Sequence, residues 1–212
     1  MSEIQTTRIG LPTGVTLKVA FAGPAEAEPI LFLHGFPESF RTWRHEMNAL
    51  ARDFRVIAPN QRGYAGSDKP EDLEDYQTEK MVEDVIALAD ALGLARFTLV
   101  GHDWGGVIAW AAAIRHPERL KRLVIANGPH PLLFQRSLIE DEAQREASQY
   151  IRALRTPGAE TAIKVMGLRT FLEKVLGAEG DLAKLPEAER QAYVDEWSEP
   201  GALTGMINWY RA

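Results

Sequence analysis

One aspartate, Asp103, stands in a pattern that exposes a reactive side chain. Its segment, Leu99–Gly106, reads LVGHDWGG and lies between an apolar strand pattern and an apolar helix pattern. Small residues on both sides let the strand turn sharply into the helix, because a Cβ would clash in so tight a turn. The side chain at the centre of such a turn stands exposed at its tip. A carboxylate, with a reference pKa near ~3.9, is ionised at neutral pH. It can displace a leaving group from saturated carbon and form an ester that water can open.

The same aspartate could instead cap the helix that follows, because Asp is among the preferred residues at helix N-termini. An isolated Gly-x-Asp-x-Gly string does not separate the two possibilities. Here the context does, since Phe97–Val100 is typical of a buried strand and Val107–Ala113 of a buried helix. The flanks therefore favour a nucleophile at a strand-to-helix turn.

Length and composition fit one globular domain with a sizeable core. Of the 212 residues, 45% are hydrophobic and 25% are charged. The net charge of −6 repels phosphates, which argues against nucleic-acid and membrane partners. The chain has no cysteine, which excludes disulfides and thiolate metal sites, and we expect no metal or cofactor. Met1–Gln5 lacks the pattern of a signal peptide, so we expect a cytoplasmic protein.

Strand and helix patterns alternate over the first 131 residues. Pro29–Leu33 is continuously apolar, as interior parallel strands are, whereas Val15–Phe21 alternates and predicts a half-exposed strand. Apolar spacing predicts a helix over Thr78–Leu92. The alternation is typical of an α/β fold with a doubly wound, mostly parallel sheet. Further predicted elements are strands at Phe54–Ala58, Phe97–Val100 and Leu123–Ala126, and a helix at Trp43–Ala51.

The pattern changes after Pro129-His130-Pro131, where charge-rich helical sequence begins and no convincing strand follows. We therefore predict two domains, a core over 1–131 and a helical cap over 132–212 that sits above the strand ends, where α/β sheets bind ligands. The predicted cap helices are Gln144–Leu154, Ala162–Leu176 and Glu187–Trp197, the last opened by Pro186.

Several short motifs together resemble the soluble epoxide hydrolases of the α/β-hydrolase superfamily. The resemblance runs from Ile30 to Tyr210, and its least regular point is Ala65, where a glycine is common. The motifs that carry it are His34-Gly35-Phe36-Pro37-Glu38-Ser39, Arg62-Gly63-Tyr64 with Gly66-Ser67, Gly101–Gly106, His116-Pro117-Glu118-Arg119-Leu120 and Asn208-Trp209-Tyr210-Arg211.

The resemblance implies roles for five positions. Asp103 would be the nucleophile, and the backbone N–H groups of Phe36 and Trp104 would form an oxyanion hole, with a cis peptide between Phe36 and Pro37. Tyr150 and Tyr210 would hold the epoxide oxygen. Opening an epoxide expels an alkoxide, and a phenol can supply the proton that this poor leaving group needs. The implied partners are a small apolar epoxide and water.

The family also uses a histidine base and an acid that follow the cap, and this chain has neither. Its five histidines are His34, His45, His102, His116 and His130, all before the cap. We therefore expect the final strands and helices of the fold to be missing from this chain, and expect a complementing C-terminal segment to supply base and acid. Alone, the chain would form the ester on Asp103 without turning over.

Two other interpretations stay open at this point. A haloalkane dehalogenase shares the aspartate, and Trp104 could serve its halide cradle, but Phe36 occupies the position of a second halide donor. Alternatively, the missing base suggests a catalytically incomplete, hydrolase-like binding module, against which the intact turn at Asp103 argues. The paired tyrosines favour epoxide hydrolysis. The oligomeric state cannot be read from this sequence.

Overall fold

Six strands form one mixed sheet in the computed structural model, which describes residues 4–179 and 182–212. The strand order is β1-β2-β4-β3-β5-β6. Met1–Glu3, part of the terminus considered above, lies outside the described residues. The strands are β1 (Gln5–Gly10), β2 (Thr16–Ala22), β3 (Glu28–Leu33), β4 (Phe54–Pro59), β5 (Phe97–His102) and β6 (Leu120–Ala126).

The centre of the sheet is parallel, as predicted. β3 pairs in parallel with β4 and with β5, and β5 pairs in parallel with β6. The first two strands differ, since β1 and β2 pair antiparallel and β2 is antiparallel to β4. Leu31 faces Leu99 in the β3–β5 register, so the strand that leads to Asp103 is held in the middle of the sheet.

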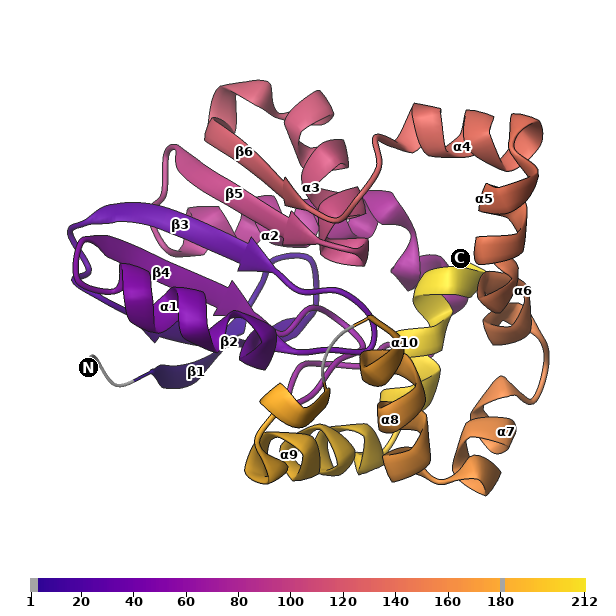
Figure 1. Cartoon of the computed structure of the whole chain (residues 1–212). Helices are drawn as coiled ribbons and strands as arrows, with labels where there is room; N and C mark the ends of the chain where they lie inside the picture. Colours follow the sequence, from indigo (N-terminus) through magenta and orange to yellow (C-terminus); the bar gives the residue numbers. More distant parts are fainter. Residues whose placement is uncertain (1–3, 180–181) are drawn as a thin grey trace.

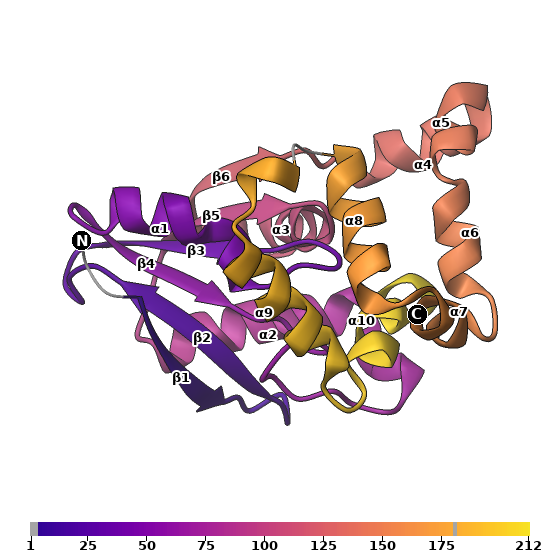
Figure 2. The same cartoon turned by 60° about the horizontal axis from the view of Figure 1, so that its bottom comes forward.

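Helices cover both faces of this sheet (Figure 2). The alternation along the strands separates two cores: Leu31 and Leu33 join one apolar cluster, whereas Ile30 and Phe32 join the other. α1 (Arg44–Leu50) contributes Met47 to the second cluster. α2 (Thr78–Ala91) and α3 (Trp104–Arg115) supply the first. This doubly wound arrangement confirms the predicted fold class.

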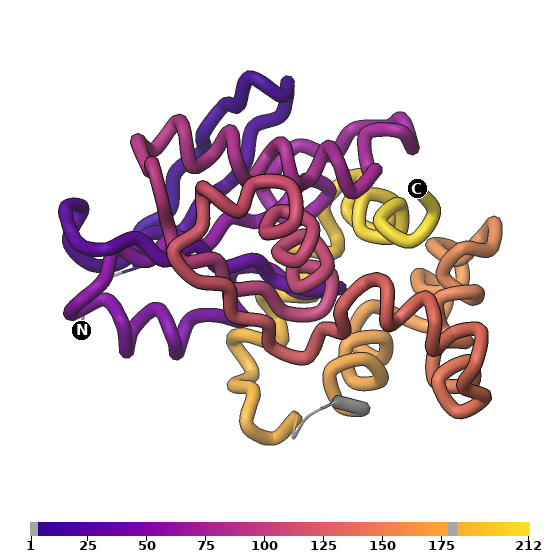
Figure 3. Tube along the Cα trace, turned by 90° about the horizontal axis from the view of Figure 1, so that it is seen from above, coloured from indigo at the N-terminus to yellow at the C-terminus, as the bar shows by residue number. Residues whose placement is uncertain are grey.

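The remaining helices lie on the side of the sheet to which the parallel strands point (Figure 1). No strand occurs between 131 and 212 among the described residues. The last of them, α10 (Ala202–Arg211), packs against the 3₁₀ helix η2 (Leu73–Tyr76) of the core, as Figure 3 also shows. These helices are α4 (Pro131–Glu140), α5 (Glu142–Ala147), α6 (Gln149–Arg155), α7 (Ala159–Met166), α8 (Leu168–Glu179), α9 (Glu187–Ser198) and α10 (Ala202–Arg211). The other 3₁₀ helices are η1 (Phe40–Trp43), η3 (Pro117–Arg119) and η4 (Leu182–Lys184).

Two of the predicted helices were wrong in their continuity. The helix predicted over Gln144–Leu154 is broken at Ser148 into α5 and α6. The helix predicted over Ala162–Leu176 is broken at Gly167, whose φ of +90° is outside the helical region.

A buried ion pair fixes the loop after β4. The Arg62 guanidinium donates two hydrogen bonds of 2.6 Å to the Asp84 carboxylate in α2, and the Arg62 carbonyl accepts the indole N–H of Trp209 at 3.0 Å. The ion pair with Asp84 fixes the loop within the core, and the hydrogen bond from Trp209 joins this loop to α10, the helix that carries Tyr210.

None of the described helices is both long enough and apolar enough to cross a membrane.

Candidate active site

Asp103 occupies the predicted turn between β5 and α3. Its φ of +50° is uncommon for a residue with a side chain. The flanking glycines are required by contact: a Cβ on Gly101 would lie 2.3 Å from the Gly105 carbonyl oxygen, and one on Gly105 would lie 2.2 Å from the Leu33 carbonyl oxygen. Asp103 precedes the first turn of α3 but makes no side-chain capping bond to it. The geometry thus does not support the capping alternative.

The Asp103 carboxyl group faces the loop after β3. The Phe36 N–H donates a 2.8 Å hydrogen bond to Oδ1 of Asp103, and Trp104 follows Asp103 directly as the first residue of α3. A Cβ on Gly35 would lie 2.7 Å from the same Oδ1, so a glycine is needed for the loop to approach. The Phe36–Pro37 peptide is cis, as expected.

Burial and hydrogen bonding act on Asp103 in opposite directions. Burial raises its pKa above the ordinary value, because a desolvated carboxylate is disfavoured. The Phe36 and Trp104 N–H groups lower it, and the net shift is upward. The residue nevertheless stays partly exposed. A carboxylate that is both reachable and incompletely solvated is well suited to attack carbon.

The two tyrosines contact each other, and Tyr210 packs against the residues on either side of this carboxyl. The ring centroid of Tyr210, in α10, lies 5.0 Å from that of Phe36 and 5.3 Å from that of Trp104. Tyr150, in α6, lies 6.2 Å from Tyr210. The structure therefore brings all five predicted site residues into one cluster, from four separate segments of the chain.

The two phenols differ in their surroundings. Tyr210 is 5% exposed and Tyr150 is 52% exposed. Burial, together with the charge of Asp103, raises the pKa of Tyr210 well above its ordinary value. Its hydroxyl therefore stays protonated across the physiological pH range and is available as a hydrogen-bond or proton donor.

Histidines support the site without facing the carboxyl. His34 is fully buried; its Nε2 accepts the Gln61 N–H at 3.1 Å, so its Nδ1–H donates to the Gly35 carbonyl at 2.9 Å. Burial lowers its pKa to about 4, so the ring is neutral. His102 pairs with Glu38, whose Oε2 lies 3.1 Å from Nδ1.

The three other histidines lie on the surface or at helix ends. His45 is exposed on α1, and His116 ends α3. His130, the nearest candidate by sequence, accepts the Leu132 N–H and packs against Trp110, with ring centroids 4.9 Å apart. No group of three or more metal-ligating side chains occurs in the part of the chain that the structure describes.

Two further residues, Glu38 and Tyr64, contribute to this site and were not predicted from the sequence. Glu38 was noted only as part of a motif, yet it pairs with the histidine beside the nucleophile. Tyr64 was also noted only within a motif, yet its ring packs edge-on against His34 at 4.5 Å and its buried hydroxyl has no hydrogen-bond partner among the described residues. Spacing along the chain carried no signal for either contact.

Comparison with known proteins places this geometry in a family. The profile described as "alpha/beta hydrolase fold" matches residues 28–204. The chain belongs to the alpha/beta hydrolase family. Among its relatives, AB hydrolase superfamily protein YfhM of Bacillus subtilis is 37% identical over 94% of this chain and 70% of its own length. Epoxide hydrolase A of Mycobacterium tuberculosis is 32% identical, over 97% of this chain and 73% of its own length.

Solved structures of alpha/beta hydrolases agree. An epoxide hydrolase from hot-environment metagenomes superposes with a TM-score of 0.89 and 45% identity, over 99% of this chain and 70% of that one. The inhibitor complex of Bacillus megaterium epoxide hydrolase gives 0.88 and 35%, over 97% of this chain and 71% of that one. The chain spans 56% of the length of Xenopus tropicalis epoxide hydrolase 3. The resemblance to soluble epoxide hydrolases is confirmed.

Proposed function

We propose that this chain carries the ester-forming site of an epoxide hydrolase. The observation that carries the proposal is the position of Asp103, whose Oδ1 accepts the Phe36 N–H while Tyr210 packs against both Phe36 and Tyr150. In this proposal the region 132–212 acts as the cap and 1–131 as the core. The cytoplasmic location remains a prediction.

The first step forms one bond and breaks another. Oδ2 of Asp103 attacks an epoxide carbon, and the C–O bond of the ring breaks with its electron pair moving to oxygen. That oxygen takes the proton of a Tyr150 or Tyr210 hydroxyl, and the product is a hydroxyalkyl ester of Asp103. The phenolate regains its proton from water. Because burial raises the pKa of Tyr210, its hydroxyl carries a proton at neutral pH when the ring opens.

The ester carbonyl is then formed where its hydrogen-bond donors already lie. Oδ1 becomes the carbonyl oxygen, and attack by water places negative charge on it. In this proposal the Phe36 N–H, which already donates to Oδ1, and the Trp104 N–H stabilise that charge. Water attack also needs a base, and both ring nitrogens of the buried His34 are already hydrogen-bonded. We therefore propose that efficient hydrolysis requires a base and an acid from a complementing segment.

The test is covalent labelling of the chain 1–212 with an aryl epoxide. Intact-mass spectrometry should show one adduct equal in mass to the epoxide, on a peptide containing Asp103, released by hydroxylamine as an ester is. Asp103→Asn should abolish the adduct, whereas Asp72→Asn, at an exposed carboxylate, should not. An absent adduct, or one at another residue, would overturn the proposal.

A haloalkane of the same carbon skeleton separates the remaining interpretations. Labelling by the haloalkane with halide release, and none by the epoxide, would identify a dehalogenase. No labelling by either would favour a binding module. Sustained diol production by the isolated chain would show that no complementing segment is needed.

A further inference from the structure

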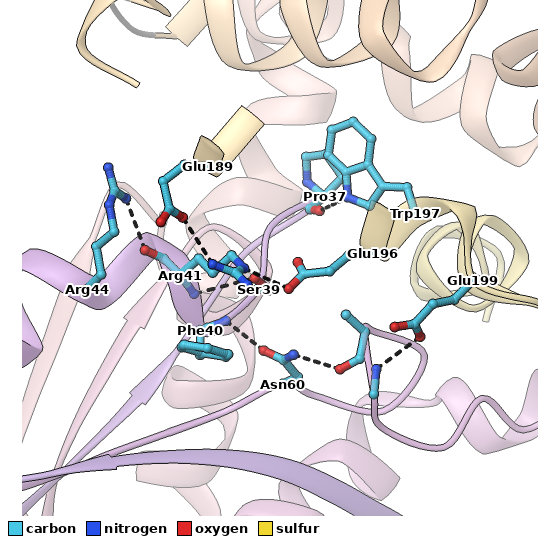
Figure 4. A network of polar contacts seen from close by, with 12 residues as sticks. Pro37, Ser39, Phe40, Arg41, Arg44, Asn60, Glu189, Glu196, Trp197 and Glu199 are labelled. Atoms are coloured by element: carbon cyan, nitrogen blue, oxygen red, sulfur yellow. Dashed lines mark hydrogen bonds and ion pairs between the residues drawn. The ribbon is translucent and has the colours of Figure 1, made fainter. Parts of the chain in front are cut away.

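Helix α9 holds the loop that carries Phe36, at the residue directly after it. The indole N–H of Trp197, in α9, donates a 2.7 Å hydrogen bond to the Pro37 carbonyl. Trp197 is 3% exposed, so this bond is shielded from water and its donor has no solvent alternative. Figure 4 shows the indole turned toward Pro37.

Helix α9 also contacts η1, the 3₁₀ helix that follows this loop. The Arg41 guanidinium makes ion pairs with two α9 carboxylates, at 2.9 Å with Glu196 and 3.3 Å with Glu189 (Figure 4). The Arg41 and Glu196 side chains are largely shielded from solvent, so the pairs are less screened than surface ones. Two anchor points fix both the position and the tilt of the segment between them.

Aromatic packing supports the loop from the side-chain direction. Phe171, in α8, lies between Trp197 and Phe36, with ring centroids 5.5 Å and 6.4 Å away. The Phe36 ring also packs against Tyr210. The backbone and the side chain of Phe36 are therefore both positioned by helices from the region after residue 131.

We infer that Trp197 is a positioning residue for the oxyanion hole, setting through Pro37 the place of the Phe36 N–H beside Asp103. The inference rests on the proposed function. An oxyanion donor stabilises developing charge only within about 2.7–3.1 Å of the oxygen, and the loop is held there by a helix distant in sequence. The reactivity of Asp103 therefore depends on how α9 packs against the loop that carries Phe36.

The test compares two Trp→Phe substitutions by their rate of adduct formation. Trp197→Phe removes the N–H and keeps an aromatic ring. Trp110→Phe is the matched control, because its indole N–H is buried without a hydrogen-bond partner among the described residues. We expect Trp197→Phe to slow labelling by roughly tenfold or more, given that losing a whole oxyanion donor costs roughly 10²–10³-fold, and Trp110→Phe to leave the rate unchanged.

The pH profile separates positioning from a general loss of stability. The Phe36 N–H lowers the pKa of Asp103, so weakening that bond should move the acid limb of the labelling rate to higher pH. The other groups around Asp103 are unchanged by the substitution: Glu38 raises its pKa and His102 lowers it, and Tyr64 and Tyr210 stay neutral because burial raises their pKa values. A loss of stability alone would leave the limb in place.

Each outcome of these measurements either supports or overturns the role of Trp197. If Trp197→Phe folds and keeps the wild-type labelling rate and the wild-type acid limb of the pH profile, the inference is wrong. Labelling of Asp103 in the wild-type chain would still support the proposed function. If Trp197→Phe does not fold, Arg41→Gln, which removes both ion pairs, decides by the same two readouts. A slower rate with a shifted limb supports the inference, and an unchanged profile overturns it.

Discussion

Asp103 combines an uncommon backbone conformation with an incompletely solvated charge. Its positive φ is maintained by the tight glycine contacts around it, and burial raises its pKa despite two N–H donors. Such features lower stability and are retained where reactivity needs them. The residue is therefore expected to trade stability for function, which a pH-dependent measurement can detect.

Asp103→Asn should stabilise the protein at neutral pH. Because the folded-state pKa of Asp103 is raised, its favourable contribution exists below the unfolded pKa of about 3.9 and is lost as pH rises through the folded value. The neutral amide avoids that loss. We expect the Tm at pH 7 to rise by roughly 2–4 °C, as for about 1 kcal/mol in a domain of this size, and the gain to vanish near pH 3.5. An equal gain at both pH values would contradict this explanation.

The paired tyrosines should act on the same oxygen. Tyr210→Phe is expected to slow labelling by about 10²-fold and Tyr150→Phe by at least about tenfold, within the usual range for acid catalysis. The double variant should lose less than the product of the two. Tyr76→Phe is the control: its hydroxyl donates to the Pro70 carbonyl, so it should lower stability but not the labelling rate. Independent, multiplicative losses would argue against a shared oxygen.

At the scale of elements, α10 is placed by a close contact between two backbones. A Cβ on Gly205 would lie 2.7 Å from the Gly63 carbonyl oxygen, and one on Gly63 would lie 2.8 Å from the Gly205 carbonyl oxygen. The helix therefore lies directly on the loop after β4. Trp209 adds its bond to the Arg62 carbonyl, and the next residue, Tyr210, packs against Phe36 and Trp104.

Gly205→Ala tests this contact. Alanine normally stabilises a helix relative to glycine, but here its methyl group has no room. We expect the free energy of unfolding, measured by urea denaturation, to fall by about 1–3 kcal/mol. Labelling of Asp103 should also be slower. Gly177→Ala in α8 is the matched control, since a Cβ there meets nothing within 4 Å, and it should gain up to about 1 kcal/mol. A stabilised Gly205→Ala would mean that α10 is not held by this contact.

At the scale of the whole molecule, the sheet has an edge at β6. This strand pairs only with β5 among the described residues, and Val124 on it is 47% exposed. An edge strand presents unpaired N–H and C=O groups that can template pairing with another chain. The isolated chain is therefore expected to self-associate through β6.

Val124→Lys should reduce that association, because an edge lysine opposes strand pairing. Sedimentation velocity over a range of protein concentrations measures it, and we expect a several-fold weaker concentration dependence. Ile114→Lys, on α3 and 61% exposed, makes the same change in charge and hydrophobicity away from the edge. Equal effects of both variants would point to general hydrophobic association instead of edge pairing.

The sequence by itself determined the local features of this protein. The glycines around Asp103 and the continuous apolar strands depend on neighbours in the chain, so their residue types predicted the turn and the parallel centre of the sheet. The cis peptide between Phe36 and Pro37 was implied by the family resemblance. The family resemblance also named five site residues that the fold brings into one cluster.

Only the tertiary structure decided how distant segments meet. The hydrogen bond of Trp197 to Pro37 and the Gly63–Gly205 contact join elements that are far apart in the sequence. Helical periodicity reports which side of an element is apolar, not which partner covers it. Packing between segments far apart in sequence supplies that information, because close contacts and shielded hydrogen bonds exist only once the chain has folded.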